Sequence, residues 1–72
     1  AGLAYCAALP ADEATRTLCG AAVGEEVRLF AELVGRAPLC ASDDEAVTRG
    51  CRFAAGLERQ RPAALPRYPV RP

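Results

Sequence analysis

The sequence predicts a small all-α protein: a three-helix bundle with two disulfides and an extended Pro-rich C-terminal tail. Three observations predict it: apolar residues at helical spacing, four Cys, and prolines gathered near the C-terminal end. The chain has 72 residues, sixteen of them Ala, so its core is thin. Because a core of this size rarely contributes more than about 3–5 kcal/mol, disulfides are expected to add stability.

The first helix is predicted over residues 11–23. Asp12 lies in its first turn, where the helix dipole favours a negative charge. Asp12 is also expected to pair with Arg16, four residues later on the same side of the helix. Gly20 lies inside the segment and is expected to weaken the helix by about 1 kcal/mol relative to Ala.

The second helix is predicted over residues 25–34, with Gly24 as a break before it and Gly35 as its C-terminal stop. Its apolar residues share one side of the helix: Val27, Phe30, Ala31 and Val34, with Leu33 beside them. The alternative is a single long helix over residues 11–34 that contains Gly20 and Gly24.

The third helix is predicted over residues 43–60 and has the clearest local signal in the chain. Ser42 as N-cap and Glu45 three residues later match a capping box. Glu45 and Arg49 are expected to form an ion pair across one turn. Pro62 ends the helix, because the residue before a proline resists helical geometry.

Residues 62–72 contain four prolines and are expected to form an extended tail after a helical domain of residues 1–61. This tail also contains Arg67, Tyr68 and Arg71. Tyr and Arg are enriched at binding hot spots, and a stiff segment loses little entropy on docking. The three residues are therefore candidates for contact with a partner.

The chain partly repeats itself at an offset of 32 residues. Residues 12–14 recur as residues 44–46, and Cys19 recurs as Cys51. A structural duplication and a chance match in an Ala-rich chain both explain this repeat, and the sequence leaves both open.

Four Cys allow three disulfide pairings. The favoured pairs are Cys6–Cys40 and Cys19–Cys51, because the first and third helices of an up-down-up bundle run parallel and residues 1–9 are expected as a short lead at its end. A two-helix hairpin would instead join Cys6 to Cys51 and Cys19 to Cys40. Local pairing, Cys6–Cys19 and Cys40–Cys51, would require each loop to fold back along its own helix.

Composition disfavours several classes of function. The chain has no His and no Lys, and its single Ser, Ser42, is explained as a helix cap, so neither an enzyme nor a cofactor is expected. A net charge of zero disfavours nucleic acid as a partner. No apolar run approaches the length of a membrane span. The gaps between successive Cys, 12, 20 and 10 residues, are wider than in ordinary zinc sites.

The function class that remains is a secreted or extracytoplasmic protein that binds another protein, as an accessory subunit, inhibitor or ligand. The chain begins at Ala1 without Met, as in a mature protein after signal-peptide removal or in a trimmed chain. Besides the tail, partner contacts are expected at whichever of Phe30, Leu33 and Phe53 the bundle leaves exposed. The alternative is an intracellular thiol or zinc-binding helical protein with reduced Cys.

Overall fold

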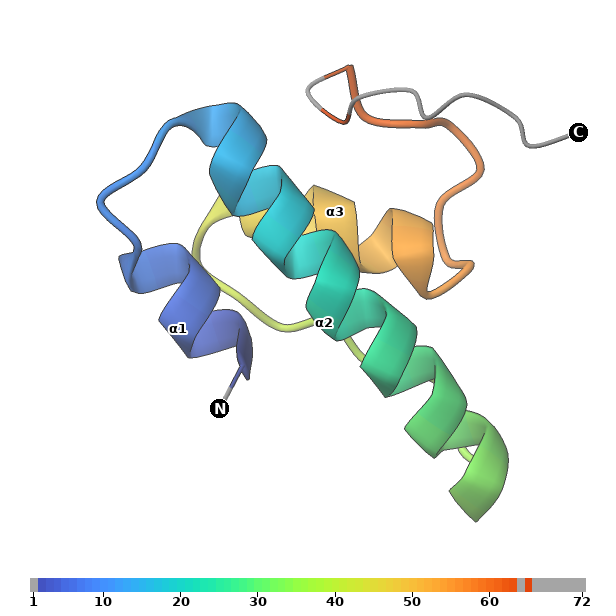
Figure 1. Ribbon diagram of the computed structural model, residues 1–72. Helices are drawn as coiled ribbons and strands as arrows, with labels where there is room; N and C mark the ends of the chain where they lie inside the picture. Colours follow the sequence, from blue (N-terminus) through green and yellow to red (C-terminus); the bar gives the residue numbers. More distant parts are fainter. Residues whose placement is uncertain (1, 64, 66–72) are drawn as a thin grey trace, which may run out of the picture.

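The computed structural model describes residues 2–63 and 65 of the chain (Figure 1). In these residues the chain forms three helices, α1 (Gly2–Ala8), α2 (Glu13–Val34) and α3 (Glu45–Ala54), and no strand. Two disulfides staple them. The predicted class, a small all-α fold with two disulfides, is therefore confirmed. None of the described helices is both long and apolar enough to cross a membrane.

The long helix α2 replaces the two shorter helices that were the first choice from sequence, so the alternative prediction is correct. Its N-cap is Asp12, whose carboxylate accepts a hydrogen bond from the Thr15 N–H at 2.8 Å. It ends as predicted at Gly35, which has a left-handed φ of 70°. There the Arg36 N–H donates to the Ala31 carbonyl at 2.9 Å and closes the last turn.

Close contact between α2 and α3 explains why the glycines inside α2 do not break it. A Cβ added at Gly20 would lie 2.2 Å from the Val47 carbonyl oxygen, and one at Gly24 would lie 2.4 Å from that of Cys51. These pairs advance together along both helices, so α2 and α3 run in the same general direction through the contact. The glycines predicted as a flaw and a break are instead where the two backbones touch.

The helix α3 is shorter at both ends than the predicted 43–60. Gly56 adopts a φ of 82°, and the Leu57 N–H donates to the Arg52 carbonyl at 2.8 Å, which ends the helix at Ala54. The N-cap is Asp44, not Ser42, because the Asp44 carboxylate accepts from the Val47 N–H at 3.1 Å.

The predicted capping box of Ser42 and Glu45 is therefore wrong, and an acidic residue, Asp44, caps the helix instead. The Ser42 hydroxyl instead accepts from the Asp44 N–H at 3.1 Å, one step before the helix. Glu45 forms the predicted ion pair with Arg49 at 2.9 Å. The predicted pair of Asp12 with Arg16 does not form, because Arg16 binds Asp44 across the fold at 3.0 Å.

The disulfides join Cys6 to Cys19 and Cys40 to Cys51, so the favoured pairing Cys6–Cys40 and Cys19–Cys51 is wrong. The reason lies in the first residues, which were expected to be a lead at one end of the bundle. They form α1, which folds back along α2 and brings Cys6 to Cys19 with 5.5 Å between their Cα atoms. The loop before α3 likewise folds back and brings Cys40 to Cys51, with a Cα–Cα distance of 5.8 Å.

The sequence repeat has a structural counterpart. Asp12 and Asp44 both accept a hydrogen bond from the N–H three residues later and cap their helices. Cys19 and Cys51 both lie two turns into those helices, and each is bonded to the Cys that precedes it along the chain. Each copy of the repeat therefore has its own cap and its own disulfide.

The core consists mostly of small side chains: Cys6, Thr17, Ala31, Ala46, Val47, Cys51, Ala55 and Leu65. The Thr17 hydroxyl is satisfied because it donates to the Glu13 carbonyl at 2.8 Å. Pro62 and Leu65 are buried, so the first residues of the predicted tail contribute to the core. The predicted partner contacts Arg67, Tyr68 and Arg71 lie outside the described residues.

Candidate functional site

The C-terminal part of α2 extends beyond the other two helices (Figure 1). The antiparallel helix α1 begins beside Val23, since a Cβ added at Gly2 would lie 3.0 Å from a Val23 methyl carbon. The contact with α3 ends near Gly24. After Gly24, Ala31 is the only buried residue of α2. The last turns of α2 therefore leave an apolar side uncovered.

Five large apolar side chains form this surface, which we call the apolar end face: Leu29, Phe30, Leu33 and Val34 of α2, and Leu39 of the following loop. Their exposed fractions are 51%, 65%, 85%, 45% and 75% in that order. The four helical residues are neighbours at i,i+3 and i,i+4 spacing. Elsewhere in the described chain only Tyr5, on α1, is a large apolar residue of comparable exposure. Contiguous exposed apolar surface of this kind marks interaction sites in soluble proteins.

A hollow of about 470 Å³ lies beside this face, between α2 and the loop that follows it. Phe30 and Leu39 line it together with the smaller apolar residues Val23, Val27, Ala31 and Ala37. Two charged residues, Glu26 and Arg36, complete the lining. The hollow thus has apolar walls and one charge of each sign.

The opposite side of the same helix segment is charged. Arg28 binds Glu25 at 2.9 Å and Glu32 at 3.3 Å. The hydrogen bond and the charge of Glu25, and then Glu32, raise the pKa of the Arg28 guanidinium above its ordinary value. The ion pairs of this segment therefore lie on one side and the apolar end face on the other, as in an amphipathic helix. Here the apolar side is exposed.

The main polar cluster between α2 and α3 has a structural role. Asp44 binds the Arg16 guanidinium at 3.0 Å and the Val47 N–H at 3.1 Å. The Val47 N–H, followed by the Arg16 charge, outweighs desolvation and lowers the pKa of the Asp44 carboxyl. Ser42 accepts from the Asp44 N–H, and its own carbonyl accepts from the Thr48 hydroxyl at 3.2 Å. These groups cap α3 and fix it to the start of α2.

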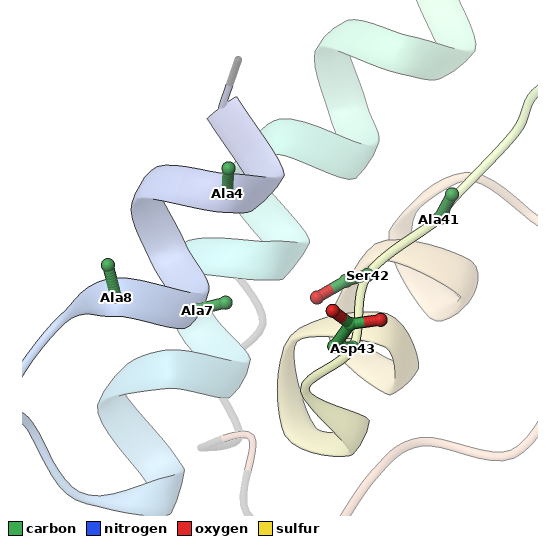
Figure 2. Close-up of a pocket in the computed structure, with 6 residues that line it drawn as sticks. All are labelled: Ala4, Ala7, Ala8, Ala41, Ser42 and Asp43. Atoms are coloured by element: carbon green, nitrogen blue, oxygen red, sulfur yellow. The ribbon is translucent and has the colours of Figure 1, made fainter.

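A second hollow, of about 540 Å³, lies between α1 and the loop before α3 (Figure 2). Its walls are four alanine methyl groups with Ser42 and Asp43. The side chains of Ala7 and Ser42 face each other across it. Because the Ser42 hydroxyl already accepts a hydrogen bond from the Asp44 N–H, this hollow has few polar groups that could recognise a ligand.

The structure separates the two predicted aromatic contacts. Phe30 lies in the apolar end face, whereas Phe53 is half-buried on α3 with the Arg61 guanidinium 5.8 Å from its ring centre. Phe53 lines a different hollow with Leu18 and Leu65. Leu33, singled out from sequence, is the most exposed residue of the face.

Sequence reasoning missed Leu29, Val34 and Leu39 as surface residues. The available signal was the density of apolar residues in 27–34, which exceeds what one helix side can bury. The exposure of Val34 could not be predicted, because residues 1–9 were expected as a short lead and not as a helix along α2.

All four Cys sulfurs are in disulfides, so the thiolates required by the zinc-binding alternative are not free. Among residues 2–63 and 65, no three His, Cys, Asp or Glu side chains lie close enough together to hold a metal ion. Neither a protein-family model, nor a curated protein, nor a solved structure matches the chain.

Proposed function

We propose that this protein acts by binding another protein through the apolar end face, and that it works as a binding module rather than as an enzyme. One observation carries the proposal: five large apolar side chains, exposed by 45–85%, lie on the last turns of α2 and the following loop, and two of them, Phe30 and Leu39, line a hollow. Exposing them is unfavourable in water, since fully burying one such side chain contributes about 1.5–3 kcal/mol. A protein partner that covers the face would recover this energy.

Two further features support this class of function. The disulfides are consistent with an oxidising compartment, and we propose that the protein is secreted or extracytoplasmic. The net charge of zero supports a protein partner over nucleic acid, because nucleic acid binds most strongly to a basic surface. In an oxidising compartment a small stapled helical protein can serve as an accessory subunit, an inhibitor or a ligand.

The test places a photo-crosslinking amino acid at Leu33 and, as a matched control, at Tyr5, which is 68% exposed on α1. Each variant is irradiated in its native extract or medium. The crosslinked protein is identified by mass spectrometry, purified and titrated against the unmodified chain. Substituting Leu33→Asp should weaken this binding roughly 10- to 100-fold, the equivalent of losing one buried Leu. Tyr5→Asp should leave it unchanged.

Two outcomes would contradict the proposal. The first is crosslinking at Tyr5 that is as efficient as at Leu33. The second is a purified complex whose affinity is the same for Leu33→Asp and Tyr5→Asp. Both residues are exposed, so neither substitution should lower thermal stability, and circular dichroism checks that both variants are folded.

A further inference from the structure

We infer that the peptide bond between Arg36 and Ala37 is a proteolytic processing site, at which an arginine-specific protease cuts the protein into two chains, 1–36 and 37–72. Three observations carry the inference: the exposure of Arg36, the lack of hydrogen bonds in the loop that follows it, and the way in which the two disulfides divide the chain. The inference does not depend on which partner the apolar end face binds.

Arg36 is available to the specificity pocket of a protease. It is exposed just beyond the projecting end of α2 and forms no ion pair with another described residue (Figure 1). Proteases of the trypsin class select Arg through an acidic residue in this pocket. The Arg36 guanidinium therefore gives up no ion pair of its own when it enters the pocket.

The chain on both sides of the bond can become extended, as main-chain recognition of a peptide segment requires. Residues 36–42 form no regular secondary structure, and residues 37–41, all of them described, form no hydrogen bond. On the other side of the bond, residues 32–35 at the end of α2 are all exposed. Exposed helix ends of this kind open locally at a small cost in free energy.

The other described arginines are less accessible to cleavage. Arg61 precedes Pro62, which is buried. Arg59 is exposed in a loop, but its neighbour Glu58 forms an ion pair with Arg52 at 3.8 Å, which holds this segment to α3. The remaining four lie within helices and form ion pairs, so a cut there requires the helix to unfold: Arg16, Arg28, Arg49 and Arg52.

The disulfides determine what the cut produces. Hydrolysis adds water across the bond: the C–N bond breaks, Arg36 ends in a carboxylate, and Ala37 begins with an ammonium group. One disulfide lies wholly before this bond and the other wholly after it, so no disulfide joins the two chains. Only noncovalent contacts, such as those of Gly20 and Gly24 with α3, then hold them together. Because nothing covalent would keep the two new ends in a protease's site, the loop is suited to be a substrate rather than an inhibitor.

The test treats the purified, oxidised full chain with a catalytic amount of trypsin and follows the products by mass spectrometry without reduction. Cleavage after Arg36 should be roughly tenfold faster, or more, than cleavage after Arg28, which requires α2 to open. The products 1–36 and 37–72 should separate under denaturing conditions without a reducing agent. Arg36→Gln should abolish this cut. The matched control, Arg59→Gln, makes the same change at another exposed loop arginine and should leave the cut unchanged.

Native material provides the second measurement. Protein isolated from its native extract or medium should contain a second N-terminus at Ala37, beside the first N-terminus of the chain. Native protein that is intact at this bond would overturn the inference. Cleavage by trypsin that is no faster after Arg36 than after Arg28 would overturn it as well, because the end of α2 would then be as protected as its middle.

Discussion

The contact at Gly50 predicts that a substitution favourable to helix formation destabilises this protein. A Cβ added at Gly50 would lie 2.1 Å from the Thr17 carbonyl oxygen and 3.0 Å from the Ala21 nitrogen. Carbon and oxygen atoms normally approach to about 3.3–3.6 Å. Because both atoms belong to the α2 backbone, the clash cannot be relieved by a side-chain rotation, and the two helices must move apart.

The size of the effect follows from two opposing contributions. Overpacking of this kind destabilises by about 1–3 kcal/mol, and the close approach to backbone atoms places Gly50→Ala at the upper end of that range. Replacing Gly by Ala within a helix returns about 1 kcal/mol. The net loss is therefore about 2 kcal/mol, which lowers Tm by roughly 10 °C for a domain of this size.

Thermal and guanidinium unfolding of the oxidised protein, followed by far-ultraviolet circular dichroism, measures this loss; the chain has no Trp for a fluorescence probe. Ala22→Gly is the control, because Ala22 is exposed within α2 and reports helix propensity alone. It should cost about 1 kcal/mol. If Gly50→Ala raises Tm, the helices do not touch at Gly50 and the described crossing is wrong.

Two further predictions concern the disulfides and the caps. A non-reducing tryptic digest should link fragment 1–16 to 17–28 and fragment 37–49 to 50–52, and a linked pair of 1–16 with 37–49 would contradict the fold. Hydrogen bonds from the side chain and then the N–H of Thr15 lower the pKa of Asp12 in the folded state, and the Val47 N–H lowers that of Asp44. The stability that these bonds contribute is therefore present above the unfolded Asp pKa, about 3.9, and is lost as pH falls below it. Asp44→Asn should therefore be less stable than wild type at pH 7 and less sensitive to acid in thermal melts. Equal acid sensitivity of the two proteins would refute the cap's contribution.

Features that depend on near neighbours in the chain could be predicted from the sequence. The stop at Gly35 and the pair of Glu45 with Arg49 follow from local spacing, and both are present. Gly20 could not be interpreted in this way. Its low helix propensity made it look unfavourable, and only the position of α3 shows that a side chain there would meet Val47. The pairing of Cys6 failed for the same reason, because it depends on the direction in which α1 leaves α2.

The candidate site was predicted to a similar extent. Phe30 and Leu33 could be singled out because they are large apolar residues in a chain with few others. Whether Val34 is covered depends on how far α1 reaches along α2, which is a property of the packing. Leu39 lies near Val27 and Phe30 because its neighbour Cys40 is bonded to Cys51, which holds the loop against α2.

The distribution of stabilising features explains how so small a protein can leave its largest apolar residues in water. Both disulfides and the glycine contacts lie around the first half of α2. The disulfides join residues separated by 13 and 11 positions, and on the chain-entropy model each contributes about 3 kcal/mol. The fold therefore does not depend on burying Phe30 or Leu33 within one chain. Substitutions at these residues should change association and leave the unfolding free energy nearly unchanged, whereas Gly50→Ala should do the reverse. Under the proposed function, stability and binding therefore depend on opposite ends of one helix, and each is expected to change without the other.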